Sequence, residues 1–542
     1  MTDMTYDLRR ESWIPCIADD GTPRVASLEE VLANAHSLRE VFHNSPLVTV
    51  SLLRLLLAVL YRALDGPKTR EEWDRLSQAD RLPEVLIRAY LDRCEAQYPG
   101  CFDLFHRERP FYQIGGLEMD RYDSVKRLGL EILNSTIFDH RDQDGELFWP
   151  PDAAACMLVA AQSFSLGFGK SSNARVDGQL WERPYSADAI ILRGLTVWLS
   201  SRSLRETLLL NLVPHDEFEG EADWSGDLPP WEQVDAMSLT DRMVKGKRQA
   251  TTALGSVDRF TWQSRLIRLL PEQRGGQLGV RRLYFTQGRE ADKAPTDPMK
   301  AYVMDEKEGW SAVPLSAAKA CWRDVHTLLL RTGPRRRQPL ALQFAASLRE
   351  LERLSEIPEL HVVGIASAPN KAGKFLLWRH ERMPLPPAYL AEPALVETLV
   401  ASTKEAETLA GELRERTKIL IRLYLAPDTN QPNGRKPDEK DVARLLENLD
   451  PLRPYWSRLE LPYSQLMRDL AGEQPAAADR WHQSLRECAE EAYREVVALL
   501  GASVRLDIAA GQVSDYFAVP GPDDTSGTRK QTKNMRKKDG EQ

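Results

Sequence analysis

The composition of the chain changes abruptly after the proline-rich segment at residues 383–387, and this change constrains the fold more than any other feature. From there to about residue 502, leucines recur at helical spacing in four segments, at 388–401, 405–425, 438–472 and 476–500. Amphipathic segments with short connections pack as antiparallel bundles. We therefore predict a four-helix bundle at residues 383–502, followed by a C-terminal extension (503–542) that ends in a disordered basic tail.

The first 382 residues alternate between helical and extended patterns. A short strand and turn should lead to a helix capped by Ser27, and residues 47–64 should form a strongly apolar helix. Four segments have the composition of strands, the last two as a hairpin: 260–270, 279–286, 361–366 and 375–381. The predicted fold class is α+β: a mixed α/β N-terminal domain (1–382) with small antiparallel sheets and hairpins, and a C-terminal four-helix bundle.

The net charge, the cysteines and the hydropathy of the chain exclude several classes of protein. The net charge of −8 means that any nucleic-acid contact must use local basic patches or the positive field of partners. The six cysteines form no C-x-x-C pair, so we expect neither a zinc site nor a disulfide scaffold. The longest apolar run, Leu52–Leu60, is interrupted by Arg54 and reads as too short and too charged to span a membrane. Without a signal-peptide pattern, the expected location is cytoplasmic.

A glycine-rich segment between Ser163 and Gly178 is the strongest candidate for a ligand contact. Glycines let the backbone approach a ligand closely, and amides beside a cation suit phosphate or a nucleic-acid backbone. Gly169-Lys170-Ser171 reads as the end of a nucleotide-binding P-loop, but the full pattern needs a glycine where Phe164 stands. We favour a polyanion-contacting loop, with a P-loop-like ATP-binding enzyme and a purely structural turn as alternatives.

Other loops carry exposed basic residues. Arg281 and Arg282 open a predicted strand, so their side chains should point to opposite faces. The hairpin tip at 369–374 combines Pro, Asn, Lys and Gly on a two-strand stem, a shape that suits a wedge in a duplex or an ordinary turn. The long loop-like stretch at 129–151 is more often functional than idle. No catalytic motif is present, so we expect no enzyme, no metal and no cofactor.

The chain resembles the large subunit of the type I-E CRISPR Cascade complex, the CasA family, over nearly its whole length. The resemblance rests on an ordered set of motifs: Trp13-Ile14-Pro15, residues 102–113, Gly167-Phe168-Gly169, the leucine-rich segment 192–211, the expected strand Phe260-Thr261-Trp262-Gln263 and the terminal bundle. Gln273–Gln277 stands where some relatives carry a cysteine cluster, which again predicts no zinc.

This resemblance implies a non-catalytic subunit that recognises the protospacer-adjacent motif of double-stranded DNA from the minor groove and helps to start strand separation. By motif, the DNA contacts fall on three elements, namely the glycine loop with its neighbours (Gly167, Phe168, Gly169, Lys170, Asn173, Arg175), the basic finger (Arg281 or Arg282) and the hairpin wedge (Asn370, Lys371, Ala372, Gly373). The loop that contacts the guide RNA's 5′ handle and the neighbouring subunit would include Asn134, Ser135, Thr136 and Arg141.

The same resemblance implies the partners. They are double-stranded target DNA, the guide crRNA, the backbone, small and handle-binding Cascade subunits, and a helicase–nuclease effector that the subunit recruits. No membrane is implied. A helical scaffold subunit without direct DNA contact remains an alternative.

Overall fold

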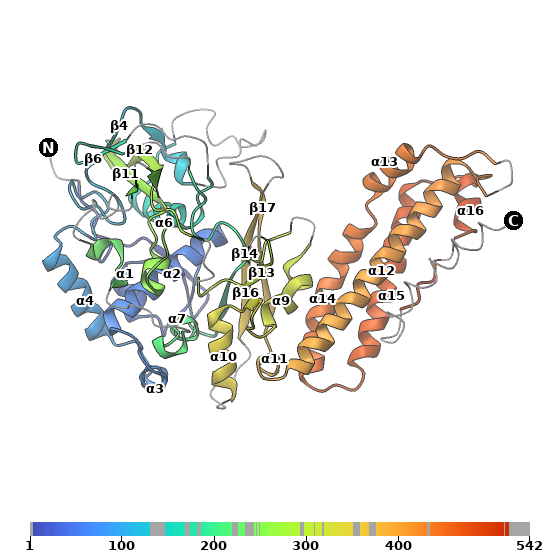
Figure 1. The fold of residues 1–542 in the computed structure, drawn as a ribbon, viewed down its shortest axis with the longest axis horizontal. Coiled ribbons are helices and arrows are strands. Elements are labelled where there is room, and N and C mark those ends of the chain that lie inside the picture. Colours follow the sequence, from blue (N-terminus) through green and yellow to red (C-terminus); the bar gives the residue numbers. More distant parts are fainter. Residues whose placement is uncertain are drawn as a thin grey trace. The chain divides into compact units, whose positions relative to one another are not determined.

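The structure is a computed structural model, and it divides the chain into two compact units, Met1–Met383 and Pro384–Gln542 (Figure 1). It describes residues 4–129, 147–167, 174–181, 186–218, 226–233, 243–244, 247–248, 250–292, 297–307, 309–316, 319–350, 358–367, 375–430, 434–513 and 515–519. The first unit combines helices with small sheets, and the described elements of the second are helices. The predicted α+β class is confirmed.

The first unit begins with a small sheet of order β2-β1-β3, built from β1 (Ile14–Ala18), β2 (Pro23–Ala26) and β3 (Leu38–Val41). The predicted helix cap at Ser27 is confirmed, because its side chain accepts from the Glu30 amide while the Glu30 carboxylate accepts from the Ser27 amide. The other helical elements of this unit are α1 (Leu28–Ala33), α2 (Pro46–Leu64), α3 (Arg70–Gln78), α4 (Glu84–Gln97), η1 (Val125–Leu128), α6 (Pro151–Phe164), α7 (Leu204–Asn211), η2 (His215–Glu217), η4 (Pro230–Glu232), α8 (Ser256–Phe260), η6 (Cys321–Asp324), α9 (Val325–Leu329) and α10 (Leu340–Glu350).

Helix α2 is the centre of the first unit, and α4, α6 and α8 pack against it (Figure 1). Its length and hydropathy would allow it to cross a membrane, so the apolar stretch is longer than the sequence run suggested. Its side chains are nevertheless mostly buried by protein. Arg54, fully buried in the middle of the helix, forms a two-pronged ion pair with Asp297 at 2.8 and 3.0 Å. These contacts identify α2 as a core helix of this unit.

The remaining strands form five further small sheets among the described residues. Their orders are β11-β12-β5, β4-β6-β7, β17-β16-β8, β14-β13-β15 and β10-β9. The strand bounds are β4 (Leu117–Met119), β5 (Asp123–Ser124), β6 (Ala174–Val176), β7 (Gln179–Trp181), β8 (Thr196–Ser200), β9 (Met243–Val244), β10 (Lys247–Arg248), β11 (Arg265–Arg274), β12 (Gln277–Gln287), β13 (Tyr302–Asp305), β14 (Gly309–Ala312), β15 (Arg336–Arg337), β16 (Glu359–Ser367) and β17 (Phe375–Pro384). The hairpin strands β16 and β17 are neighbours, as predicted.

The predicted start of the strand at Phe260 is wrong. Helix α8 ends at Phe260, and β11 starts only at Arg265. The carboxylate of Asp227 accepts from the amides of Val257 and Asp258, at 3.0 and 2.6 Å, and thereby caps the short helix. Because Asp227 lies about thirty residues earlier, no local pattern signals this cap.

The second unit contains a bundle of four main helices whose boundaries differ from the predicted segments. The first two segments are one helix, α12 (Pro393–Leu425), in which the Thr403 hydroxyl donates to the Leu399 carbonyl inside an unbroken turn. The third divides at the left-handed residue Asp450 (φ 35°) into α13 (Glu439–Leu449) and α14 (Leu452–Ala471). The remaining helices are α11 (Ala388–Ala391), α15 (Ala477–Leu499) and α16 (Val504–Ala510).

Two histidines on the β17-β16-β8 sheet, the buried His361 and the half-buried His380, make stability depend on pH. The Nε2 atom of His361 lies 2.8 Å from the Ser200 hydroxyl oxygen, and its Nδ1 atom lies 3.0 Å from Nε2 of His380. Both distances are those of hydrogen bonds. Burial, followed by the charge of Arg382, lowers the pKa of His361 to about 2 and that of His380 to about 4. Histidines in the unfolded chain take up protons near pH 6.5, whereas these two stay neutral in the folded protein. Their contribution to stability is therefore fully present above about pH 6.5 and is lost as the pH falls toward their folded pKa values.

We expect His361 to remove about 2 kcal/mol of stability between pH 7 and pH 5, and this loss should continue as the pH falls toward the folded pKa of about 2. The half-buried His380 should contribute less, and its contribution should level off near pH 4. Urea unfolding at the two pH values measures this loss. In His361→Gln the pH-dependent loss should shrink by about that amount, whatever the variant's stability at pH 7. An equal loss in the variant and the wild type would contradict the assignment.

Candidate nucleic-acid interface

The glycine-rich segment leaves the core at the end of α6. Gly167 donates its amide to Asp188 Oδ1 at 2.7 Å, and a β-carbon on Gly167 would stand 2.6 Å from the Ser186 carbonyl oxygen. Close packing between two chain segments therefore requires this glycine. The other predicted contacts of the loop lie outside the described residues: Phe168, Gly169, Lys170 and Asn173.

The order of elements around this segment excludes the P-loop alternative. A P-loop runs from a strand through the glycine-rich turn into a helix, whose N-terminus holds the phosphate. Here helix α6 precedes the segment and strand β6 follows it. The ATP-binding interpretation of Gly169-Lys170-Ser171 is therefore wrong.

A single buried arginine ties the two ends of the glycine-rich segment together. Arg265, at the start of β11, donates to the carbonyls of Ser165 (3.1 Å) and Leu166 (3.0 Å) before the segment and to that of Ala187 (2.7 Å) after it. Its other terminal nitrogen donates to Gln287 Oε1 at 2.9 Å, and the same oxygen accepts the Ala187 amide. We call Arg265 and these partners the arginine clamp.

The electrostatics of the clamp are those of a buried cation. Arg265 is fully buried, and burial lowers the pKa of its guanidinium to about 9, while the charge of Asp188 supports the protonated form. Asp188 also holds the Gly167 amide and pairs with Arg193 at 2.5 Å. The base of the glycine-rich segment is thus fixed on both sides, whatever its outer residues contact.

The structure brings the Arg175 strand against the β11–β12 hairpin. Ala174 and Val176 of β6 share a hydrophobic cluster with Leu266 of β11 and Tyr284 of β12. Arg175, between them on the strand, is exposed, as expected from the alternation of side chains. The glycine-rich segment and the hairpin therefore stand on one core.

Arg281 and Arg282 do not point to opposite faces as predicted. The register of the hairpin shifts between Leu270, which pairs with Arg282, and Pro271, which pairs with Val280, so Arg281 is the extra residue of a β-bulge. Both arginines consequently reach the same carboxylate, Glu272, at 3.1 and 3.5 Å. This shared partner offsets part of their positive charge.

The tip of the same hairpin presents a basic residue that the sequence reading missed. Gly275 and Gly276 both have positive φ (57° and 81°), which joins the long strands β11 and β12 by a tight turn. Arg274, directly before them, is exposed and has no ion pair with any residue that the structure describes. The Gly-Gly pair between two apolar runs was the available signal.

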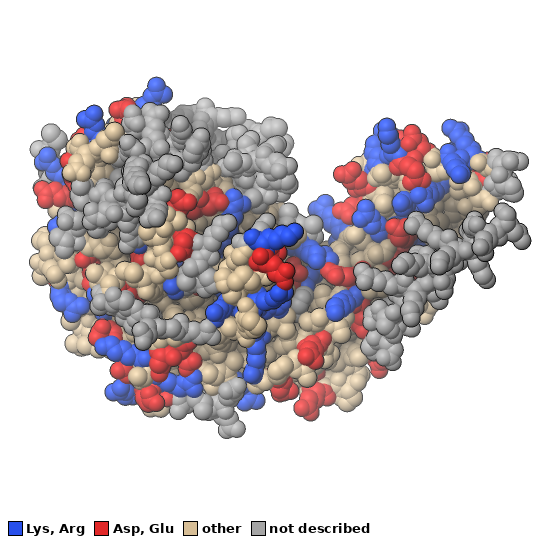
Figure 2. All heavy atoms as spheres, viewed as in Figure 1, with Lys and Arg blue, Asp and Glu red and all other residues tan. Residues whose placement is uncertain are grey.

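The remaining predicted contacts lie outside the described residues. This holds for the hairpin wedge (Asn370, Lys371, Ala372, Gly373) and for the long loop (Asn134, Ser135, Thr136, Arg141). In the part that the structure describes, no group of three or more His, Cys, Asp and Glu side chains could hold a metal ion. On the face drawn in Figure 2, acidic and basic side chains are interspersed among the described residues, so a polyanion contact on this face would use single residues rather than a broad basic area.

Comparison with known proteins places the chain among CRISPR-associated proteins. The family model described as CRISPR-associated protein Cse1 matches residues 7–492. The CRISPR-associated protein CasA/Cse1 of Thermus thermophilus is 31% identical over 507 residues, which cover 92% of this chain and 94% of that protein. The crystal structure of Cse1 from Acidimicrobium ferrooxidans has a TM-score of 0.75 at 26% identity and covers 94% of this chain and 96% of its own. The crystal structure of Thermus thermophilus CasA has a TM-score of 0.75 at 28% identity, with 94% and 98% covered.

Proposed function

Because the chain belongs to the CRISPR-associated protein Cse1 (CasA) family, the large subunits of CRISPR Cascade complexes, we propose that it recognises the protospacer-adjacent motif of double-stranded target DNA. In this proposal the subunit is non-catalytic, belongs to a type I-E complex, reads the motif from the minor groove and helps to separate the strands. Guide RNA pairing then reads the target sequence.

The arginine clamp is the observation that best supports this function. It fixes both ends of the glycine-rich segment to the start of the β11–β12 hairpin, so two protruding elements share one rigid base. The minor groove offers a degenerate pattern of acceptors with one extra donor on G·C pairs. Discrimination there depends on close backbone approach, and a fixed base keeps a glycine loop at a constant depth.

We assign the basic finger to the hairpin tip at Arg274 rather than to Arg281 or Arg282. The latter two share Glu272, whereas Arg274 is exposed at the end of a two-stranded stem. A cation at the end of such a stem can reach a phosphate or a groove edge without the cost of breaking an ion pair. Asn370, Lys371, Ala372 and Gly373 remain the proposed wedge.

The proposal also covers the partners. Asn134, Ser135, Thr136 and Arg141 would contact the crRNA handle and the neighbouring subunit, and the helical bundle would contact the small subunits. The N-terminal domain (1–382) would receive the helicase–nuclease effector. The acidic net charge of the chain fits a subunit that holds duplex DNA only within the assembled complex.

Duplex binding by the assembled RNA-guided complex tests the proposal. We expect discrimination between targets that differ only in the flanking motif to require this subunit. Arg274→Ala should weaken binding of the motif-bearing duplex about tenfold and leave binding of a pre-melted target within about twofold, since one charge-assisted contact is lost. Gly169→Val should act in the same direction, because a side chain there would hinder backbone approach.

Arg88→Ala, which removes an exposed arginine on α4 that pairs with Glu84 and Glu29, is the matched control for the loss of one positive charge. It should change neither measurement. Equal motif discrimination with and without the subunit would refute the recognition role and leave the scaffold alternative, which predicts loss of assembly without loss of preference.

A further inference from the structure

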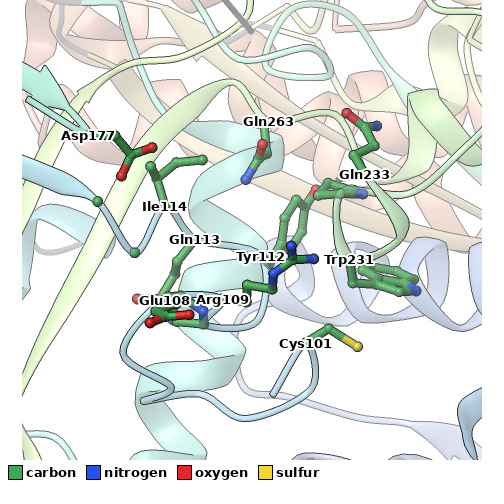
Figure 3. A pocket seen from close by; sticks show the side chains of 14 residues that line it. Cys101, Glu108, Arg109, Tyr112, Gln113, Ile114, Asp177, Trp231, Gln233 and Gln263 are labelled. Atoms are coloured by element: carbon green, nitrogen blue, oxygen red, sulfur yellow. The ribbon is translucent and has the colours of Figure 1, made fainter. Parts of the chain in front are cut away.

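A cavity of about 460 Å³ opens in the first unit beside the β4-β6-β7 sheet (Figure 3). Its lining comes from four separate parts of the chain: residues 101–116, Asp177 in the turn after β6, residues 230–233, and Gln263 before β11. A cavity of this size is in the range of small-molecule and cofactor sites. Among the residues that the structure describes, the lining includes neither Gly167 and Arg175 of the glycine loop nor Arg274 at the hairpin tip.

Two aromatic rings form walls that the surrounding structure holds in place. The rings of Tyr112 and Trp231 stand at 87° to each other with centroids 6.4 Å apart. Tyr112 is fixed by its hydroxyl, which donates to the Trp262 carbonyl, and Trp231 by its indole nitrogen, which donates to the Tyr90 hydroxyl at 2.8 Å. The left-handed backbone at Tyr112 (φ 57°) costs roughly 1 kcal/mol or more and orients its ring.

Gln263 is the lining residue that best indicates a ligand site. Only 5% of its surface is exposed, yet its side-chain amide has no hydrogen-bond partner among the described residues. In Figure 3 this amide points into the space that the labelled side chains surround. Gln113, also in the lining, has both ends of its amide occupied, by the Leu104 carbonyl and the Leu269 amide. An amide that opens to a cavity and makes no hydrogen bond within the described protein is free to bond a ligand there.

The charges that line the cavity determine which chemical groups can bind inside it. Glu108 and Asp177 are exposed carboxylates in the lining, and Arg109 is the one guanidinium among its described residues. Net negative charge disfavours a phosphate group inside. A flat, neutral group with donors and acceptors on its edge suits the aromatic walls and the open amide, and nucleobases have this chemistry.

We propose that the cavity holds one unstacked nucleobase of a single-stranded nucleic acid, with the Gln263 amide bonded to the base edge. That the strand is the guide RNA or the separated target DNA rests on the function proposed above. The sugar and phosphate remain at the mouth, where the half-buried Arg109 offsets part of the charge of the exposed Glu108 and Asp177. Base recognition here would hold a strand in place rather than read a flanking motif.

The test uses the full chain and trinucleotides that carry a central 2-aminopurine, in ribose and deoxyribose forms. Stacking on the cavity wall should quench the fluorescence. Gln263→Met, which keeps the side-chain size but loses both hydrogen-bonding groups, should weaken binding about five- to tenfold. Gln78→Met, at an exposed glutamine on α3, should leave it unchanged. An unlabelled trinucleotide with a central adenine should displace the probe at least about tenfold better than its abasic counterpart.

Tighter binding of the ribose form would assign the guide, and of the deoxyribose form the target. Unchanged binding by Gln263→Met, or equal displacement by the abasic strand, would overturn the proposal. Gln263→Glu, which also loses the donor, serves as a second variant if Gln263→Met does not melt like the wild type. The assay contains no flanking motif and no other subunit, so its failure is separate from that of the recognition function.

Discussion

Arg265→Met should destabilise the protein by about 4 kcal/mol and abolish motif-dependent duplex binding. The substitution leaves the carbonyls of Ser165, Leu166 and Ala187 buried without the donor that they share. Each unsatisfied buried group costs about 1–3 kcal/mol, and methionine supplies no donor. The ends of the glycine-rich segment would also separate, so the loop would lose its fixed depth.

Urea unfolding followed by tryptophan fluorescence measures the stability, and duplex binding by the reconstituted complex measures the function. Arg268→Met is the matched control, since Arg268 lies three residues further along β11 and makes one weak bond, to the Leu117 carbonyl at 3.3 Å. We expect it to cost less than about 1 kcal/mol. Comparable losses in the two variants would show that the clamp has no special role.

The second large effect is expected from Asp297→Ala, which should cost about 3–5 kcal/mol. Burial alone would raise the pKa of Asp297, but the adjacent Arg54 guanidinium outweighs burial and the pKa is lowered. Removing the carboxylate leaves that guanidinium charged and fully buried in α2, with the Arg259 carbonyl as a remaining partner. An unpaired buried charge is among the most destabilising changes.

Chemical unfolding again gives the measurement, and an exposed ion pair gives the control. Glu306→Ala removes the partner of Arg335 on the surface, where both side chains are mostly exposed, and should cost at most about 1 kcal/mol. The double variant Arg54→Met/Asp297→Leu should recover part of the loss, because no unpaired charge remains. A double variant as unstable as Asp297→Ala would argue that packing, not charge, causes the effect.

The features that depend only on neighbouring residues, such as helix caps and continuous apolar helices, were predicted correctly from the sequence. The cap at Ser27 follows from its own neighbours, and the helix at α2 follows from a continuous apolar stretch. The joining of two predicted helices into α12 shows the limit, since Ser402 and Thr403 are poor helix formers but are buried against the bundle. Packing decided this boundary.

The candidate site could not be predicted in the same way, because its contacts span long sequence separations. The clamp joins Arg265 to carbonyls about 80 to 100 residues away, and a charged residue at the start of a strand normally indicates a solvent-facing position. The bulge at Arg281 depends on the pairing register, which alternation alone does not reveal. Gln263 belongs to one of the motifs that carry the family resemblance, but nothing in the sequence indicates a ligand contact there: only the cavity shows that its amide is open.

The ion pair between Arg54 in α2 and Asp297 also has a consequence for folding during synthesis. Arg54 and Asp297 are 243 residues apart, so at roughly 5–20 residues per second the ribosome needs about 12–50 s to supply the partner. During that interval the apolar helix α2 carries a cation whose buried partner has not yet been synthesised. We therefore expect slow codons between the two positions to lower the yield of soluble protein, because they lengthen this interval.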